Sequence, residues 1–292
     1  MQVKLTKSVI TVGSWTLLSR ILGMVREILL STFIGAGPLL DAFVAAFRLP
    51  NIFRRFFAEG AFNAAFVPLF AKRYESNMEP KEFANNVFAN LLTLLLILTS
   101  IAMVFMPVLV FLTAAGFASD ERFDSTVDFG RIMFPYILFL SLAALFSGIL
   151  NTTGRFAMAA AAPVILNIII VVALLMAWAT QHNIMEWLVW SIPIAGIVQL
   201  SLLWLATYKT GIKITLSLPK WNKDIGNLIR LAIPAALAGG VLQINLLVGQ
   251  LVASQVTGAI SFLYFADRLY QLPLGIAGIA VGTVLLLSLI HI

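Results

Sequence analysis

The chain has 292 residues, of which 61 % are hydrophobic and only 11 % are charged, and its mean hydropathy is +0.99. This balance excludes an ordinary soluble domain, which needs much more polar surface. The net charge of +6 and the isoelectric point near 9.8 leave nucleic acid as a partner to be tested against the placement of the basic residues. The absence of cysteine from the sequence excludes disulfides, thiolate metal sites and cysteine nucleophiles.

Apolar runs long enough to cross a bilayer as helices recur along the whole chain. They are continuous and rich in Leu, Ile and Ala, which favours helices over the alternating strands of an outer-membrane barrel. The run after Lys4 and Lys7 is too long for a signal peptide, so we interpret it as a retained first span. We therefore expect an all-α polytopic membrane protein with eight spans, at about 8–34, 38–71, 83–113, 127–151, 158–180, 186–208, 226–253 and 257–290.

The basic residues between these spans lie mostly on one side of the membrane. The loop between the third and fourth spans contains Arg122 together with Asp120, Glu121 and Asp124. With the N-terminus inside, the cytoplasmic segments hold Lys4, Lys7, Lys72, Arg73, Lys81, Arg155, Lys209, Lys213, Lys220 and Lys223. This positive-inside pattern predicts a cytoplasmic N-terminus and accounts for the basic isoelectric point without a nucleic acid partner.

The polar stretch 208–227 separates six predicted spans from the last two. We interpret it as a linker with an interfacial segment anchored by Trp221. After it, "ADRLYQLP" at 266–273 resembles "AFRLPNIF" at 46–53, which lays Arg268 on Arg48 at an offset of 220 residues, although a chance match in apolar sequence is an alternative. A true repeat predicts a six-helix N-terminal lobe (1–207), a cytoplasmic linker (208–225) and the start of a second, truncated lobe (226–292), with substrate bound between the lobes.

The first two predicted spans carry charged residues at membrane depth. Each costs roughly 2.5–3.5 kcal/mol where it faces lipid, so these residues must face protein or water. Asp41, Arg48 and Arg55 follow one another at intervals of seven, which places them on one helix face. The full set is Arg20, Arg26, Glu27, Asp41, Arg48, Arg54, Arg55 and Glu59.

Two interpretations of these charges remain open at this point. In the structural one, residues near the helix ends reach the headgroups and the others form ion pairs, with Asp41 and Glu59 as partners of arginines. In the functional one, they line a water-filled cavity in which arginines outnumber carboxylates, and Arg268 beside Asp267 adds another cation. A cationic cavity predicts an anionic ligand, and the planar guanidinium suits phosphate or pyrophosphate.

Three stretches resemble the MurJ (MviN) family, the bacterial lipid II flippases of the MOP exporter superfamily. The first begins at Ser19 and reads "SRILGMVREILLSTFIGAGPLLDAFVAAFRLPNIFRRFFAEGAFNAAFVPLF". The others are "FPYILFLSLAALFSGILNTTGRFAMAAAAPVILNI" at 134–168 and "YFADRLYQLPLGIAGIAVGTVLLLSL" at 264–289. The resemblance implies a MOP/MATE-like fold of fourteen transmembrane helices in two six-helix lobes with two extra helices, in which helices 1, 2, 7 and 8 line the cavity. This chain matches roughly the first half.

The resemblance also implies roles for individual residues. Arg20, Arg26, Arg54 and Arg268 fall on cavity arginines that engage the pyrophosphate, and Ser19 and Asn51 fall on their polar neighbours. Asp41 and Glu59 fall on carboxylates near the two gates, and we expect Glu27, Arg48, Arg55 and Asp267 to form ion pairs or gate contacts. The helical periodicity favours Arg55 over Arg54 on the cavity face, whereas the family pattern favours Arg54. Glu27 and Gln271 replace residues that are often Asp and sometimes Glu in the family.

The function implied by the resemblance is translocation of lipid II, the undecaprenyl-pyrophosphate-linked disaccharide-pentapeptide, across the bacterial cytoplasmic (inner) membrane. This step would serve peptidoglycan synthesis and cell shape. We expect alternating access by a monomer in contact with membrane lipids, driven by membrane potential or an ion gradient, with no cofactor, metal or catalytic residue.

Two other classes of function were weighed. Another MOP exporter, either an oligosaccharide-lipid flippase or a multidrug antiporter, is the nearest alternative, although an antiporter for cations would need a carboxylate-rich cavity. A membrane-embedded glycosyltransferase or phosphatase would need paired metal-binding acids or a catalytic histidine. The sequence has no D-x-D or H-x-x-E motif.

Overall fold

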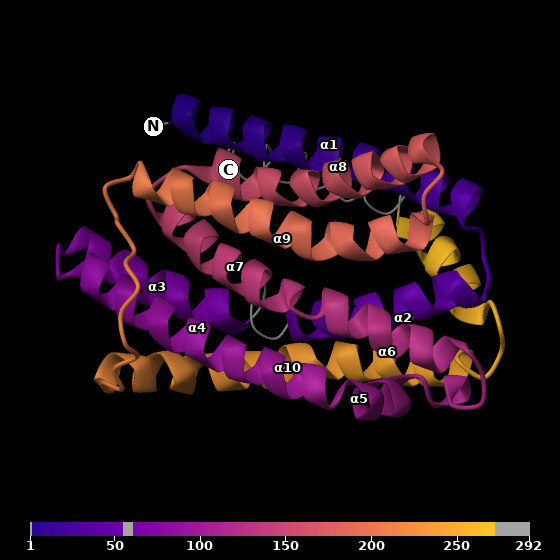
Figure 1. The fold of residues 1–292 in the computed structure, drawn as a ribbon. Helices are drawn as coiled ribbons and strands as arrows, with labels where there is room; N and C mark the ends of the chain where they lie inside the picture. The colour runs from indigo at the N-terminus through magenta and orange to yellow at the C-terminus, as the bar shows by residue number, and fades with distance from the viewer. Residues whose placement is uncertain (1, 55–60, 272–292) are drawn as a thin grey trace.

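The computed structural model describes residues 2–54 and 61–271, apart from the side chains at 2–10, 53, 54, 61, 239, 241 and 242. The described chain folds into long helices joined by short turns (Figure 1). In chain order these are α1 (Gln2–Phe33), α2 (Pro38–Arg54), α3 (Ala61–Glu75), α4 (Pro80–Val104), α5 (Met106–Thr113), the 3-10 turn η2 (Ala115–Phe117), α6 (Arg122–Met133), α7 (Tyr136–Thr152), α8 (Phe156–Thr180), α9 (Ile184–Tyr208) and α10 (Lys223–Ala253). A last described helical segment covers 259–271.

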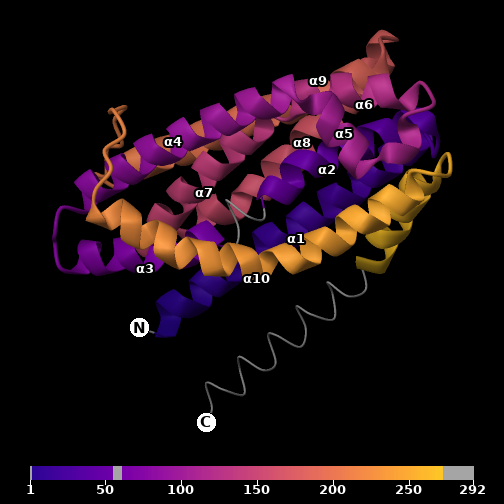
Figure 2. The ribbon, with the colours of Figure 1, turned by 90° about the horizontal axis from the view of Figure 1, so that it is seen from below.

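The helices lie roughly side by side, so the described part of the molecule has two ends (Figures 1 and 2). One end, which we call the linker end, carries the start of α1 and the connections 76–79, 153–155 and 209–222. The other, which we call the turn end, carries the connections 34–37, 114–121, 181–183 and 254–258. Successive spans therefore alternate in direction, as in a multi-pass membrane protein.

Local sequence signals set several helix ends. After α1, Gly35 takes a φ of 72° and donates its backbone N–H to the Leu30 carbonyl at 3.1 Å, which closes the helix in a left-handed cap. The side chain of Asn183 accepts the backbone N–H of Met185 at the start of α9, and Asn222 does the same for Ile225 in α10. Polar caps thus mark the points where the chain re-enters an apolar helix.

The all-α fold is confirmed for the described residues, but two predicted spans are interrupted helices. The predicted span 83–113 is broken at Phe105, between α4 and α5, and Pro107 stands in the first turn of α5. The predicted span 127–151 begins earlier, at Arg122, and is broken between α6 and α7 next to Pro135. Proline has no N–H to continue the helical ladder, so a continuous apolar run does not guarantee a continuous helix.

By length and composition, four described segments qualify as membrane spans: Pro80–Val104, Arg122–Thr152, Phe156–Thr180 and Ile184–Tyr208. A fifth, bent segment within Lys223–Ala253 also qualifies. The predicted second span covers α2 and α3, but its central residues 55–60 lie outside the described part. The predicted last span is described only to residue 271, and the division into two lobes around 208–225 stays a prediction.

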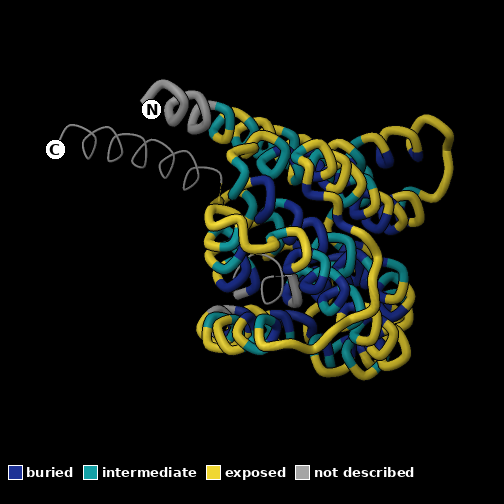
Figure 3. The backbone as a smooth tube through the Cα atoms, turned by 90° about the vertical axis from the view of Figure 1, so that its left-hand side faces the viewer, coloured by how far each residue is buried: buried dark blue, intermediate teal, exposed yellow. Residues whose placement is uncertain are grey.

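Helix packing brings α10, near the end of the described part, onto α3. On one side, α1 packs on α8, α8 on α9, and α9 on α7, while α2 packs on α6. The later helix α10 packs mainly along α3 and reaches α5 and η2 at the turn end (Figure 2). The colouring of the backbone in Figure 3 shows that the buried residues lie in the interior between these helices. Stacked Phe62, Phe66 and Phe83, with ring centroids 5.4–5.9 Å apart, anchor the packing of α3 against α4.

Candidate functional site

Glu27 of α1 is the centre of a largely buried network of charged side chains. Its Oε1 accepts hydrogen bonds from Arg26, at 2.5 Å from Nη2 and 3.2 Å from Nε, and from the Tyr264 hydroxyl at 2.9 Å. Arg268 Nε lies 3.7 Å from the same oxygen. The other oxygen, Oε2, is buried and has no hydrogen-bond partner within the described ranges. One carboxylate oxygen therefore attracts three side chains from two distant parts of the chain.

Asn167 of α8 holds Arg26 from the other side. Its Oδ1 accepts a hydrogen bond from Arg26 Nη1 at 2.9 Å, and its Nδ2 donates to the Ser19 carbonyl at 2.9 Å and lies 3.4 Å from the Ser19 hydroxyl. Ser19 and Arg26 are seven residues apart, on one face of α1. The amide of Asn167 thus links two turns of α1 and fixes the direction of the Arg26 guanidinium.

Arg268 is the more open member of the pair of arginines around Glu27. Its side chain is 40 % exposed, against 10 % for Arg26. Its guanidinium carbon lies 5.2 Å from the Tyr264 ring centroid, within the range of a cation–π contact. Beside it, Gln271 donates to Asp267 at 2.6 Å and lies 3.4 Å from Arg268 Nη1. Glu27 is the only acid among the described residues that forms an ion pair with these arginines, so the Arg26–Glu27–Arg268 group by itself carries one net positive charge.

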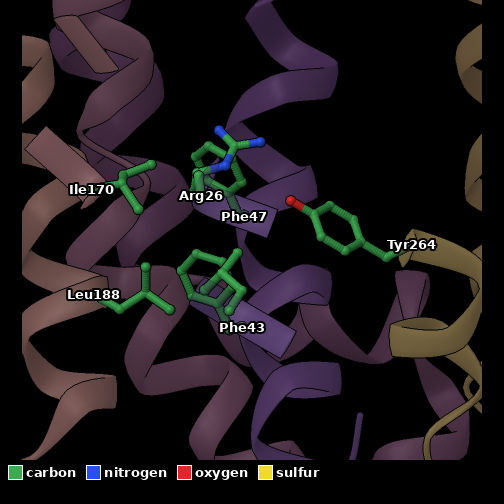
Figure 4. A pocket seen from close by; sticks show the side chains of 7 residues that line it. Arg26, Phe43, Phe47, Ile170, Leu188 and Tyr264 are labelled. Atoms are coloured by element: carbon green, nitrogen blue, oxygen red, sulfur yellow. The ribbon is translucent and has the colours of Figure 1, made fainter. Parts of the chain in front are cut away.

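A narrow pocket borders this group. Figure 4 shows Arg26, Phe43 and Phe47 between Tyr264 on one side and Ile170 and Leu188 on the other. Leu30 completes the lining. Apart from Arg26 and the Tyr264 hydroxyl the lining is apolar, so Arg26 lies in a largely apolar setting. In such a setting electrostatic attraction is screened less than in water.

Asp41 of α2 forms a second centre at the turn end. Its Oδ1 accepts the Ser261 backbone N–H at 2.8 Å and the Ser261 hydroxyl at 2.6 Å. Its Oδ2 accepts the Gly258 N–H at 2.6 Å and lies 3.4 Å from Arg122 Nη1. We call Asp41, Arg122, Gly258 and Ser261 the Asp41 clasp. Because two of its donors are backbone N–H groups at the start of helix 259–271, Asp41 caps that helix from outside.

Arg122 of the clasp is shared with a second carboxylate. Its Nη2 lies 2.5 Å from Asp120 Oδ2, and its Nε lies 2.9–3.0 Å from both Asp120 oxygens. The hydrogen bond from Arg122 lowers the pKa of the Asp120 carboxyl below its usual value. The guanidinium also stacks over the Phe117 ring, 4.3 Å from its centroid. Arg122 is thus held by Asp120 and Phe117 in addition to its contact with Asp41.

Three further contacts near the turn end join α10 and the residue after it, Ser254, to α2, α5 and η2. The Gly116 N–H donates to the Ser254 hydroxyl at 3.0 Å, and a Cβ on Gly116 would come within 2.4 Å of the Ser254 carbonyl group. Gln250, fully buried, lies 3.4 Å from Arg48 Nη1 and 3.3 Å from the Thr113 carbonyl oxygen. The backbones therefore approach closely at this end.

The predicted site residues fall into several groups. The structure brings Ser19, Arg26, Glu27 and Arg268 into the Glu27 network, whereas Asp41 and Arg48 contact the later helices nearer the turn end. Asn51 donates to the Phe47 carbonyl of its own helix at 2.8 Å. Arg20 is partly exposed, and its buried Nε has no hydrogen-bond partner in the described part of the chain. The Arg54 side chain and residues Arg55 and Glu59 lie outside the described residues, so the choice between Arg54 and Arg55 stays open.

Sequence reasoning missed Asn167, Tyr264 and Gln250 as members of these networks. Asn167 had a usable signal, because it is a single polar side chain in the apolar run of α8. A polar group buried in a membrane helix needs a partner, and such groups join helices. Arg122 was interpreted only as a loop residue, yet its side chain is 5 % exposed. Among the described residues, no group of three or more His, Cys, Asp or Glu side chains is arranged to hold a metal ion.

Comparison with known proteins points to one protein family. The family model described as lipid II flippase MurJ matches residues 30–290. A probable lipid II flippase MurJ of Rhizobium tropici is 49 % identical over 289 residues, which cover 97 % of this chain and 54 % of that protein. The lipid II flippase MurJ of Burkholderia cenocepacia is 34 % identical, over 98 % of this chain and 57 % of that protein.

Solved structures of two transporters have a similar fold. A structure titled lipid II flippase MurJ, inward closed conformation, aligns with a TM-score of 0.76 at 30 % identity, over 91 % of this chain and 55 % of that one. An outward-facing multidrug resistance MATE family transporter of the MOP superfamily aligns with a TM-score of 0.67 at 20 % identity, over 95 % of this chain and 61 % of that one, which shows the fold alone.

The fold is therefore that of MOP superfamily transporters. The chain belongs to the lipid II flippase MurJ family, which is a family of transporters rather than enzymes. It spans about half the length of the curated relatives that it matches.

Proposed function

We propose that the protein carrying this chain translocates lipid II across the bacterial cytoplasmic membrane. Family membership supports the assignment, because the relatives are named as lipid II flippases. The observation that carries the mechanism is the Arg26–Glu27–Arg268 group, in which two guanidiniums from distant helices share one carboxylate oxygen. Charge at membrane depth is costly, so such a group needs a reason to be there.

The diphosphate of the lipid would bind by replacing Glu27. A carboxylate and a phosphate present the same kind of oxygen to a guanidinium, and phosphate offers more of them with more negative charge. Arg268 is partly exposed and supplies the first contact, while Arg26 is held in position by Asn167. Replacing Glu27 also breaks its hydrogen bond with Tyr264, which joins α1 to helix 259–271. Anion binding and separation of these helices would thus be coupled.

Alternating access would use the turn end as one gate. In the described conformation that end is held by the Asp41 clasp and by the contact of Gly116 with Ser254. An outward-open state requires these contacts to break, because they tie α2 and η2 to α10 and helix 259–271. The basic residues of the linker end favour an orientation in which that end and the N-terminus are cytoplasmic.

The net positive charge of the group around Glu27 is compatible with transport driven by the membrane potential. Membrane potential acts on mobile charge at about 2.3 kcal/mol per elementary charge per 100 mV. The net positive group around Glu27 would be drawn back toward the negative interior once the anion is released. We propose transport by a monomer in contact with membrane lipids, driven by the potential or an ion gradient, without a cofactor and without nucleic acid.

The test is complementation of cells depleted of their own flippase, with lipid II on the outer face as the readout. The full-length gene product is expected to restore exposure, and Arg268→Ala and Arg26→Ala are expected to abolish it. Arg131→Ala is the matched control, because that arginine is 46 % exposed and lies 4.0 Å from Asp128 outside the network. Rescue that survives both network variants would overturn the arginine mechanism.

The same assay separates the nearest alternative. Failure of the unaltered protein to restore lipid II exposure, with normal membrane insertion, would favour another MOP exporter. A multidrug antiporter for cations is disfavoured by the net positive charge around Glu27, because it would repel a cationic drug.

A further inference from the structure

The connection between α9 and α10 is an extended segment that is bound to α4 through its backbone. The Thr215 N–H donates to Asn85 Oδ1 at 3.0 Å, and the Lys220 N–H donates to Asn86 Oδ1 at 3.2 Å. Asn90 Nδ2 donates to the Lys220 carbonyl at 3.2 Å. Three asparagine amides of one helix therefore fix two points of the connection. We call residues 212–222 the strap.

The strap has an apolar face that starts inside the protein and continues outside it. Ile212 and Ile214 are buried in the hydrophobic core cluster that also contains residues of α4 and α7. Leu216 and Leu218 continue the alternation but are 81 % and 83 % exposed. Trp221 is 76 % exposed. The two amide-bound points lie on either side of the exposed leucines, so these side chains are held away from the protein.

The position of the strap in the fold indicates what surrounds its apolar face. The strap joins the end of α9 to the start of α10, and both helices qualify as membrane spans. It runs over the rim of the linker end, outside the helices, as the end-on view of Figure 3 shows. A segment between two span ends lies at the level of the lipid headgroups, where Trp and other amphipathic side chains are enriched.

The charges of the strap indicate the kind of lipid. Lys213 and Lys220 of the strap, and Lys223 directly after it at the start of α10, are exposed, and Lys213 Nζ lies 4.9 Å from the Tyr208 ring centroid. The nearby acid Asp224 is already engaged by Arg73 at 2.5 Å. Glu82, in the first turn of α4, is the acid of the supporting helix. The lysines thus carry an excess of positive charge beside exposed apolar side chains.

We propose that the strap is a preformed binding surface for anionic phospholipid at the membrane interface. Leu216, Leu218 and Trp221 insert among the upper acyl chains, and the lysines bind the phosphate groups of the headgroups. The asparagine amides hold the backbone in the conformation that makes both contacts at once. The surface ties the start of α10 to the bilayer, independently of any transported substrate.

The first experiment measures the depth of the strap in vesicles. This chain contains no cysteine, so a nitroxide on Leu218→Cys in the full-length protein, freed of any further cysteine, reports one position. We expect oxygen, which concentrates in lipid, to relax this label more than a water-soluble nickel complex does. The matched label on Ser217→Cys, the adjacent exposed residue, is expected to show the reverse. Labels that both respond mainly to nickel would overturn the insertion.

The second experiment tests the headgroup. Native mass spectrometry of the protein from vesicles of equal phosphatidylglycerol and phosphatidylcholine is expected to show at least threefold more retained phosphatidylglycerol. The triple change of Lys213, Lys220 and Lys223 to Gln is expected to remove this preference. Changing Lys72, Lys81 and Arg155 to Gln, at the same end but outside the strap, is the control with the same loss of charge. Equal retention of both lipids by the unaltered protein, or loss of the preference in the control alone, would overturn the proposal.

Discussion

Asp41, which is buried, and Glu27, whose side chain is 12 % exposed, both join the first helices to helix 259–271, but their bonding differs. Asp41 accepts two hydrogen bonds on Oδ1, and its Oδ2 has one hydrogen-bond donor and one ion-pair partner. Glu27 places all of its contacts on Oε1 and leaves Oε2 buried and without a hydrogen bond among the described residues. Both oxygens of the first carboxylate have partners, whereas the second carboxylate has one buried oxygen with unused bonding capacity.

The two carboxylates differ in the kind of hydrogen-bond donor that each one has. Two donors of Asp41 are backbone N–H groups at a helix start, which keep their geometry as long as the helix exists. The donors of Glu27 are side chains, and the partly exposed guanidinium of Arg268 has room to turn toward another anion. We therefore interpret the Asp41 clasp as a contact that holds a conformation, and the Glu27 network as one that exchanges partners.

The largest expected effect is that of Asp41→Asn on stability. Removing the charge leaves Arg122 with Asp120 alone and replaces an acceptor oxygen of the helix cap with an amide donor. We expect the free energy of unfolding to fall by about 3 kcal/mol, at the low end for breaking a buried ion pair because Asp120 remains. Thermal unfolding in detergent, followed by tryptophan fluorescence, measures the change. Asp128→Asn, with a side chain that is 71 % exposed, is the control, and equal behaviour of the two variants would contradict the clasp.

Glu27→Gln is expected to raise the affinity for inorganic pyrophosphate about tenfold, which corresponds to about 1.4 kcal/mol. The amide keeps a hydrogen bond with Tyr264 but no longer competes as an anion for Arg26 and Arg268. Isothermal titration of the purified full-length protein measures the affinity. Glu186→Gln, on the exposed first turn of α9, should leave it unchanged. An affinity that does not rise in Glu27→Gln would refute exchange between the carboxylate and phosphate.

An effect of similar size, but on stability, is expected for Asn167→Leu. The leucine has a similar volume but leaves Arg26 Nη1 and the Ser19 carbonyl without their partner, so stability should fall by about 1–2 kcal/mol. A double-mutant cycle with Arg26→Ala isolates the contact, and a coupling near zero would show that Asn167 does not orient Arg26. Ile168→Leu, the exposed neighbour, is the control for a change of shape on α8.

The smallest effect concerns the pH dependence of Asp120. Arg122 lowers the pKa of this carboxyl in the folded protein, so the unfolded chain binds the proton more readily. The stabilisation is therefore complete above the unfolded value of about 3.9 and is lost as the pH falls through the lower folded pKa. The side chain is 38 % exposed, which limits the size of the effect through solvent screening. Asp120→Asn is expected to weaken the pH dependence of the free energy of unfolding between about pH 5 and pH 3. A pH dependence equal to that of the unaltered protein would contradict the assignment.

Several features of the fold and site followed from local sequence. The apolar runs predicted a helical membrane protein, and the cost of burying charge identified Arg26 and Glu27 as residues that need partners. The helix breaks were missed because hydropathy averages over a window and hides single residues. Pro107 and Pro135 carried the signal, since neither can donate the hydrogen bond that continues a helix.

The partners themselves were not predictable from local patterns. Asp41 and Arg122 are 81 residues apart, and Arg26 and Asn167 are 141 apart. Periodicity assigns a side chain to a face of its own helix, but it does not say which helix packs against that face. For the same reason Tyr264 was overlooked, because its hydroxyl matters only through its approach to Glu27.

The amino-acid sequence by itself determined that the chain is helical, that it crosses a membrane several times and that some of its charges are sheltered from lipid. These outcomes depend on hydropathy, spacing and solvation costs, which act on each segment separately. Only the tertiary structure decided that Glu27 shares its oxygen with Arg26, Tyr264 and Arg268, and that Asp41 caps helix 259–271. Hydrogen bonds have a range of about 3 Å, so their pairing depends on how distant helices pack and not on composition.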